Sequence, residues 1–213
     1  MIKINHSDQF ICLFDNFLKT ISGSLSGTGR KNPGDSVQSK DMTSKEFRLS
    51  GKLMRVNHAG EVAAQGLYQG QLLFEKNENM VNYFHKAAEE EADHLIWTSS
   101  QVAKLNSRES YLNSLWYWGA FMLGLGASLS GNEKSLGFLA ETERQVANHL
   151  DSNLKILPKN DESSRMIVQT MLHDETEHAL WAENSDNFVK LSKLLKNFMK
   201  NGAKIMISCS QRI

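Results

Sequence analysis

The most constraining feature of this sequence is a pair of Glu-x-x-His motifs, Glu91/His94 and Glu175/His178, which lie 84 residues apart. Because positions i and i+3 share one face of an α-helix, each motif directs a carboxylate and an imidazole at the same point. Two further glutamates precede the motifs by 30 and 32 residues: Glu61 and Glu143. The spacing indicates an internal duplication, in which each copy is a pair of helices carrying one glutamate and one Glu-x-x-His motif.

This set of side chains is typical of a site for two transition metals in a ferritin-like bundle, where two helices each give a Glu and two others each give a Glu-x-x-His motif. Four carboxylates and two neutral imidazoles suit two divalent ions of intermediate softness, and both iron and manganese accept these ligands. The predicted metal ligands are Glu61, Glu91, His94, Glu143, Glu175 and His178.

Glutamates on helices are usually solvated, so the prediction depends on where these four fall in the helical pattern. Each has the phase of apolar residues: Met54 and Tyr68 share the stripe of Glu61, for example. An isolated carboxylate would be costly to bury at such a position. A buried charge persists when it is paired or bound to a metal. We therefore expect a buried dinuclear site rather than four surface acids.

Three more residues are candidates for a supporting catalytic role. Glu90 and Asp174 each stand immediately before a motif glutamate, in equivalent positions of the two copies. Metal-bound histidines usually donate their second ring N–H to a carboxylate, which predicts hydrogen bonds from His94 to Asp174 and from His178 to Glu90. His149 lies nearly two turns after the fourth glutamate and could reach the site or a substrate entrance. For all three, the alternative is a surface or partly exposed side chain outside the site.

Helical periodicity from Leu49 onward predicts an all-α protein, and the chain contains only two prolines. We expect residues 1–48 to form an amphipathic segment followed by a flexible linker at Ser22–Ser44, which is rich in Ser, Gly, Asn and Lys. Residues 49–213 are predicted to form a ferritin-like four-helix bundle with an extra apolar crossover helix at 111–129 and a basic amphipathic C-terminal helix.

Charge and cysteine content bear on the partner and on the cellular compartment of this protein. The 24 Lys and Arg residues balance 24 Asp and Glu residues, so bulk charge does not point to a nucleic-acid partner. Two cysteines, Cys12 and Cys209, are too few for a disulfide framework, and reduced cytosol is the expected compartment. The first thirty residues match neither a transit peptide nor a secretory signal.

Two segments predict contact with a membrane surface. Leu115–Leu129 is strongly apolar but shorter than the ~20 residues that a spanning helix needs. Beyond Asp186 the chain has five lysines, one arginine and no acid, interspersed with apolar residues at helical spacing. A basic amphipathic helix of this kind is typical of proteins that lie in a lipid interface. We expect a peripheral protein on the cytoplasmic side of the cell membrane; the alternative is that both segments are bundle core or a contact in a homo-oligomer.

Four sequence blocks closely resemble the demethoxyubiquinone hydroxylase family: LMRVNHAGEVAAQGLYQGQ, AAEEEADHLIW, SLGFLAETERQVANHLDSNL and DETEHA. The resemblance runs from about Leu49 to Ile213 and implies a di-iron, O₂-dependent monooxygenase. Its implied substrate is a polyprenylated methoxy-methyl-benzoquinol, a demethoxyubiquinol of ubiquinone biosynthesis. The six predicted ligands match the family positions, with Glu91 and Glu175 bridging, and His149 matches a position near the metals.

The resemblance implies two Fe²⁺ ions as cofactor and allows NADH as reductant, although the sequence contains no Gly-x-Gly-x-x-Gly dinucleotide motif. A lipid-binding partner from ubiquinone biosynthesis and a homo-oligomer both stay open. The alternative function is an iron-handling or redox protein of the ferritin or rubrerythrin kind, without an organic substrate. The isolated positions of Cys12 and Cys209 argue against the Cys-x-x-Cys iron module that such a redox protein would add.

Overall fold

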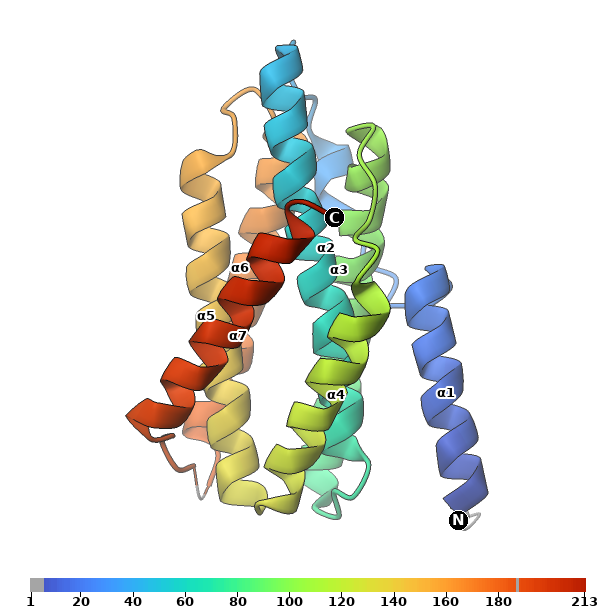
Figure 1. Ribbon diagram of the computed structural model, residues 1–213, viewed down its shortest axis with the longest axis vertical. Coiled ribbons are helices and arrows are strands. Elements are labelled where there is room, and N and C mark those ends of the chain that lie inside the picture. The colour runs from blue at the N-terminus through green and yellow to red at the C-terminus, as the bar shows by residue number, and fades with distance from the viewer. Residues whose placement is uncertain (1–5, 187) are drawn as a thin grey trace.

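The computed structural model describes residues 6–186 and 188–213, and over these residues every regular element is a helix (Figure 1). The prediction of an all-α fold is confirmed. The first five residues of the predicted segment 1–48 lie outside the described part. The elements are α1 (His6–Ser22), the short 3-10 helix η1 (Pro33–Ser36), α2 (Ser44–Leu72), α3 (Glu78–Lys104), α4 (Asn113–Leu129), α5 (Asn132–Ile156), α6 (Glu162–Asn184) and α7 (Lys193–Ser210).

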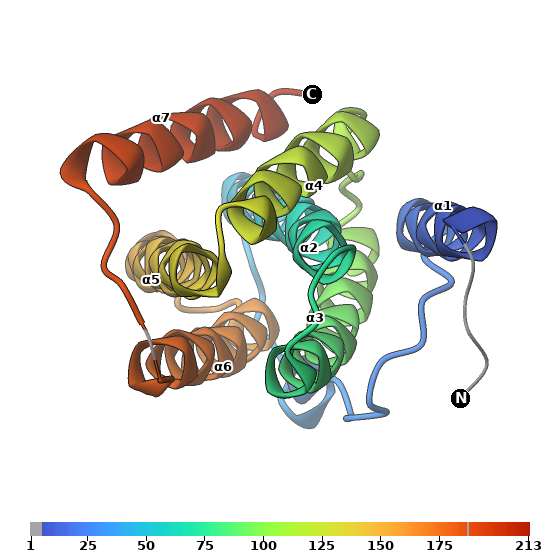
Figure 2. The same cartoon turned by 90° about the horizontal axis from the view of Figure 1, so that it is seen from below.

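Four of these helices, α2, α3, α5 and α6, form a ferritin-like bundle that Figure 2 shows almost end-on. The hairpin of α2 and α3 packs beside the hairpin of α5 and α6. Between the hairpins, α4 runs back along α2, so that α5 starts at the same end of the bundle as α3 (Figure 1). This is the single crossover connection of ferritin-like folds. The amphipathic α7 lies outside the bundle on the same side as α4 (Figure 2).

Polar caps fix where the bundle helices begin. Thr43 precedes α2 and forms a capping box with Glu46: the Glu46 N–H donates to Thr43 Oγ1 at 3.3 Å, and the Thr43 N–H donates to Glu46 Oε2 at 2.8 Å. The predicted boundary between residues 48 and 49 therefore falls inside α2. At the start of α6, the Ser164 N–H donates to Asp161 Oδ1 at 3.0 Å.

Glycines allow α4 to lie directly against α2. A Cβ at Gly66 would be 2.2 Å from the Tyr117 carbonyl oxygen, and one at Gly124 would be 2.2 Å from the Leu67 carbonyl oxygen. Only one face of α4 is buried by this close packing. The opposite face leaves large apolar side chains in contact with solvent: Leu115, Met122, Leu123 and Leu129.

Two of the apolar clusters fill opposite ends of the bundle. One is built from the first halves of α2 and α6 and the second halves of α3 and α5, and it includes Met54, Trp97, Leu150 and Met171. The other is built from the remaining halves of the same helices, and it includes Tyr68, Phe84, Leu139 and Ala182. The motif residues come from the middle of each helix and so lie between the clusters.

The segment between α1 and α2, for which composition predicted a flexible linker, makes specific contacts with the bundle. Its 3-10 helix packs against α6, and a Cβ at the buried Gly34 would be 2.9 Å from Ile167. Further along, the Lys40 N–H donates to the Asn160 carbonyl oxygen at 2.9 Å. These are individual polar and glycine contacts, which leave no periodic pattern in a sequence, and the flexibility of the segment stays a prediction.

The helix α1 lies outside the four-helix bundle. The α1 helix contacts α4 through aromatic rings, since the ring centroid of Phe17 is 5.1 Å from that of Tyr117 and 5.0 Å from that of Trp118.

In the part of the chain that the structure describes, no helix combines the length and apolar character needed to cross a bilayer.

Candidate metal centre

The six predicted ligands converge in the middle of the bundle. Glu61 comes from α2, and Glu143 comes from α5. The two Glu-x-x-His motifs lie on α3 and α6, where helical spacing places each glutamate and histidine on the inner face. None of the six residues is more than 5% exposed, so water does not solvate these carboxylates.

Two groups of side chains with metal-binding geometry meet at this point. The first contains Glu61, Glu91, His94 and Glu175, and the second contains Glu143, Glu175 and His178. Within each group, one ligand atom per residue lies within 4.8 Å of the others. Glu175 belongs to both groups, so the two candidate metal positions are adjacent.

Glu91 and Glu175 each face both histidines. Glu91 Oε2 lies 3.1 Å from His94 Nδ1, and Glu91 Oε1 lies 3.3 Å from His178 Nδ1. Glu175 Oε1 lies 3.3 Å from His94 Nδ1, and Glu175 Oε2 lies 3.4 Å from His178 Nδ1. These are the positions from which a carboxylate can bridge two ions.

The outer nitrogen of each histidine faces a carboxylate from the other Glu-x-x-His helix. His94 Nε2 lies 2.9 Å from Asp174 Oδ2, and His178 Nε2 lies 2.8 Å from Glu90 Oε2. These are the pairs that the sequence predicts, whereas their role in supporting a metal is still a prediction. Because Nε2 is engaged on the outside, Nδ1 is the ring nitrogen that faces the candidate metal positions.

His149 lies in neither group. Its Nε2 is 3.2 Å from Asn153 Nδ2, and the Asn153 amide in turn donates to Asn57 Oδ1 at 2.7 Å. A role of His149 at a substrate entrance stays a prediction. Sequence reasoning did not foresee the contact of Tyr68, whose hydroxyl donates to Glu143 Oε1 at 2.8 Å. The helical phase predicted that Tyr68 is buried, but phase alone does not reveal a hydrogen bond.

Sequence reasoning also missed Arg30. Its Nη1 donates to Asp174 Oδ2 at 2.7 Å, although the two residues are 144 positions apart in the chain. The residue lies in the segment that composition assigned to a flexible linker, and no motif marks it.

The electrostatics of the site favour bound cations. Burial raises the pKa of the Glu61 and Glu143 carboxyl groups well above the ordinary range. Burial also acts against ionisation of Glu91, but the neighbouring imidazoles of His94 and His178 outweigh it, and the pKa of Glu91 falls below its usual range. In the absence of bound cations, burial therefore disfavours the charged forms of Glu61 and Glu143.

One buried oxygen is also without a donor. Glu91 Oε1 lies 3.3 Å from His178 Nδ1 but accepts no well-aligned hydrogen bond within the described residues. An unpaired buried carboxylate oxygen is costly, whereas two divalent cations would satisfy it and balance the charge of four carboxylates. The buried Glu and His groups thus fit a metal centre in both geometry and charge.

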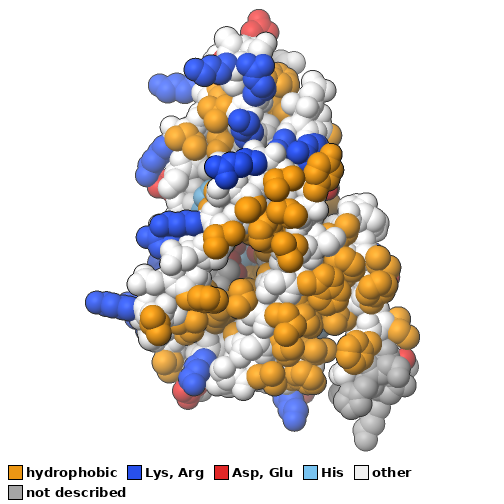
Figure 3. All heavy atoms as spheres, viewed as in Figure 1, with side chains coloured by type: hydrophobic (Ala, Val, Ile, Leu, Met, Phe, Trp, Pro, Cys, Tyr) orange, Lys and Arg blue, Asp and Glu red, His pale blue; other side chains and the backbone are white. Residues whose placement is uncertain are grey.

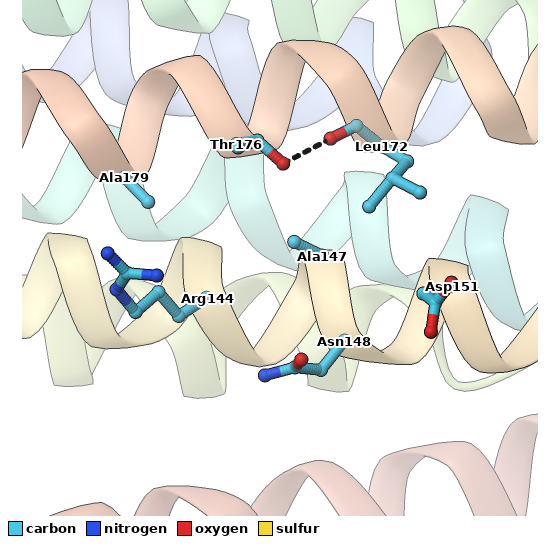
Figure 4. A pocket seen from close by; sticks show the side chains of 7 residues that line it. All are labelled: Arg144, Ala147, Asn148, Asp151, Leu172, Thr176 and Ala179. Carbon is cyan, nitrogen blue, oxygen red and sulfur yellow. Dashed lines mark hydrogen bonds between the residues drawn. The ribbon is translucent and has the colours of Figure 1, made fainter.

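A surface pocket between α5 and α6 lies apart from this centre (Figure 4). Its lining includes none of the six predicted ligands: Arg144, Ala147, Asn148, Asp151, Leu172, Thr176 and Ala179. The hydrogen bond drawn in Figure 4 joins Thr176 Oγ1 to the Leu172 carbonyl oxygen within α6, at 2.7 Å.

Comparison with known proteins gives one consistent result. The family model described as "Ubiquinone biosynthesis protein COQ7" matches residues 48–210. A protein of Methylibium petroleiphilum named 3-demethoxyubiquinol 3-hydroxylase is 44% identical over 214 residues, which cover 100% of both chains. Proteins of the same name from Nitrosococcus oceani and Nitrosomonas eutropha are 40% and 47% identical, over 96% and 82% of this chain and 95% and 84% of their own lengths. The chain therefore belongs to the COQ7 family of ubiquinone biosynthesis proteins.

Proposed function

We propose that this protein is an O₂-dependent di-iron monooxygenase that hydroxylates the ring of a polyprenylated methoxy-methyl-benzoquinol, a demethoxyubiquinol, in ubiquinone biosynthesis. The observation that carries the proposal is the convergence of four buried glutamates and two buried histidines in a chain similar over its whole length to 3-demethoxyubiquinol 3-hydroxylases. Carboxylate-rich sites of this kind in ferritin-like bundles hold two iron or manganese ions.

The proposed ligand sets follow the two groups. Glu61 and His94 would hold one ion, and Glu143 and His178 would hold the other, with the carboxylates of Glu91 and Glu175 shared between them. When bound, the two irons supply the activation of O₂ that ring hydroxylation requires.

The protein's own contribution is to hold the ligands and to exclude water. The apolar clusters at the two ends of the bundle close the site along its axis. Asp174 and Glu90 accept the outer ring protons of His94 and His178, so the neutral imidazoles keep Nδ1 directed inward. The Tyr68 hydroxyl donates to Glu143 Oε1 and leaves the second oxygen of that carboxylate for an ion.

A membrane surface is the proposed location of the substrate, because a polyprenyl tail partitions into lipid. Figure 3 shows apolar side chains gathered over α4, with Lys and Arg side chains toward the α7 side and the top of the same view. On α1 and α7 the exposed apolar residues are Phe10, Ile11, Phe14, Leu18, Leu194, Leu195, Phe198 and Ile205. An apolar surface next to lysines favours peripheral attachment to an anionic bilayer, on the cytoplasmic side of the cell membrane.

The test is reconstitution of the purified protein with Fe(II) under anaerobic conditions, followed by ¹⁸O₂ and a short-tailed demethoxyubiquinol. The proposal predicts a hydroxylated product with one ¹⁸O atom by mass spectrometry, and parallel assays with and without NADH identify the source of electrons. Consumption of O₂ by the iron-loaded protein with an unaltered quinol would instead support the iron-handling alternative.

A further inference from the structure

Arg30, in the segment between α1 and α2, contacts the outer edge of the candidate metal centre. Its Nη1 donates to Asp174 Oδ2 at 2.7 Å, and its Nε donates to Asp93 Oδ2 at 3.1 Å. Asp174 Oδ2 is the same atom that lies 2.9 Å from His94 Nε2, and Arg30 Nη2 itself lies 3.4 Å from that ring nitrogen. The guanidinium carbon also lies 4.9 Å from the centre of the Trp97 ring. Two carboxylates and one aromatic face therefore fix the orientation of the Arg30 head group.

Asp93 anchors the segment that carries Arg30. Its side chain is only 3% exposed, and it also accepts a hydrogen bond from the Thr28 hydroxyl. Gly27 packs directly on the same residue, since a Cβ there would be 2.1 Å from Asp93 Oδ1 and 2.9 Å from the Asp93 backbone nitrogen. A side chain at position 27 would displace the segment. The place where Arg30 enters the site is therefore set by specific contacts.

Among the described residues, the second histidine, His178, has no equivalent support. The carboxylate beside His178 is Glu90, and it forms an ion pair with Lys86, one turn earlier on the same helix. Lys86 Nζ lies 3.4 Å from Glu90 Oε1. The Lys86 side chain is 73% exposed, whereas that of Arg30 is 35% exposed. An exposed i,i+4 lysine pair contributes little and is screened by salt. The planar guanidinium of arginine also presents a rigid fork of N–H donors that orients a carboxylate, whereas the ammonium of lysine is a compact charge on a flexible stem.

We propose that Arg30 is a positioning residue of the metal centre, which holds Asp174 and thereby the ring of His94 in place for metal binding. This role makes the His94 position the tighter of the two metal positions. The inference rests on the proposed dinuclear site. It assigns part of the metal affinity to residues 27–30, which lie outside the duplicated helices and before the start of the family match at residue 48.

The test replaces Arg30 in the full-length protein by glutamine, which keeps the polar head but removes the charge and the fork of donors. The metal-free protein is titrated with Co(II), and binding is followed by the visible absorption of the bound ion. Loss of a carboxylate partner of a metal-bound histidine typically lowers metal affinity about 10- to 100-fold. Because Arg30 acts through that carboxylate, we expect Arg30→Gln to weaken the tighter Co(II) step by about 10-fold, at the lower end of this range, and to leave the weaker step unchanged.

Two lysines provide matched controls. Lys31→Gln removes the same charge from the next residue, which is exposed, and Lys86→Gln removes the cation beside Glu90. Both variants should keep the tighter step close to that of the wild type. If Lys31→Gln weakened it as much as Arg30→Gln, the effect would be one of general charge and the positioning role would be refuted.

A double variant and a metal-free measurement separate positioning from simple destabilisation. In the presence of Asp174→Asn, the change Arg30→Gln should cost much less affinity than it does in the wild type, because Arg30 acts on His94 chiefly through Asp174 and otherwise only through the 3.4 Å approach of its Nη2 to His94 Nε2. In the metal-free protein, the ¹⁵N resonances of the His94 ring should shift in Arg30→Gln and stay unchanged in Lys31→Gln. A lower melting temperature of Arg30→Gln with both affinities and ring resonances unchanged would contradict the proposal.

The outcomes also distinguish this inference from the proposed function. A wild-type protein that binds fewer than two Co(II) ions would overturn both. A wild-type protein that binds two ions, with an Arg30→Gln variant that titrates identically or loses both steps equally, would overturn only the positioning role of Arg30.

Discussion

The His94 half and the His178 half of the bundle present the same inner side chains but different surroundings. Each half has one Glu-x-x-His motif, and each outer ring nitrogen faces a carboxylate, 2.9 Å away for His94 and 2.8 Å away for His178. Beyond that carboxylate the halves diverge. Asp174 contacts a guanidinium held by a buried aspartate, whereas Glu90 contacts an exposed lysine.

The aromatic neighbours of the two histidines differ as well. The ring centroid of His94 lies 5.3 Å from that of Trp97, and the Trp97 ring also contacts the guanidinium of Arg30. The ring centroid of His178 lies 6.2 Å from that of Tyr83, in an edge-on arrangement. The Tyr83 ring stacks on the Trp181 ring, with their centroids 3.3 Å apart. The repeated motifs thus supply the same predicted ligands to both halves, whereas residues outside the repeat pattern make the two halves unequal.

The largest effect is expected where the halves share a ligand. Glu175→Ala removes a carboxylate that belongs to both groups. Since even outer partners of a ligand are worth about 10- to 100-fold in affinity, loss of a shared ligand should abolish binding of both metals and hydroxylation. Metal content by elemental analysis and product formation by mass spectrometry measure this. Glu177→Ala, an exposed change on the same helix, is the control. A Glu175→Ala protein that retains two irons and full activity would refute the assignment.

Changes at the unshared glutamates should separate the two positions. Glu61→Gln should empty the His94 position, and Glu143→Gln should empty the His178 position, because each residue belongs to one group only. Each variant should bind a single Co(II) ion, with a different absorption spectrum in the two cases. If both variants lost both ions, the two positions would be too strongly coupled to be compared in this way.

A smaller effect is expected at the segment that makes the halves unequal. Gly27→Ala places a Cβ 2.1 Å from Asp93 Oδ1 and should displace Arg30. Overpacking of this kind costs roughly 1–3 kcal/mol in the free energy of unfolding. The variant should also weaken the tighter Co(II) step, as Arg30→Gln does. Urea unfolding and Co(II) titration measure both effects, with Ser26→Ala as the neighbouring control. Unchanged stability would show that the segment has room for a side chain at position 27.

The smallest effect is expected at Tyr68. Tyr68→Phe removes the hydroxyl that donates to Glu143 Oε1 and adds no volume. The metal-free protein should lose about 1 kcal/mol in the free energy of unfolding, the typical value of one hydrogen bond. Denaturant unfolding measures it, and Tyr111→Phe, at a position that is 74% exposed, is the control. Any change in metal affinity should appear at the His178 position; a change only at the His94 position would contradict the grouping of Glu143 with His178.

Much of the fold could be predicted from the sequence because the bundle helices bury repeated apolar faces. The predicted segment 111–129 contains α4, and the helices that carry the predicted ligands follow the apolar stripes. The convergence of the six side chains also followed from their helical phase, since a carboxylate in an apolar stripe is directed to the bundle interior.

The rest could not be predicted because it depends on single contacts between distant residues. The start of α2 is set by the capping box of Thr43 and Glu46, which precedes the apolar stripe on which the prediction relied. The docking of residues 27–30 depends on the absence of a side chain at Gly27 and on the partners of Arg30. Neither a glycine without a Cβ nor a single arginine in a Ser- and Gly-rich segment produces a periodic sequence pattern from which its contacts could be predicted.

The most direct test of the central claim is anomalous diffraction at the iron edge from crystals of the protein grown with Fe(II). Two iron peaks are expected inside the bundle, both flanked by Glu91 and Glu175, with one nearest His94 and the other nearest His178. A single peak, or iron bound only at the surface with the six side chains unliganded, would contradict it.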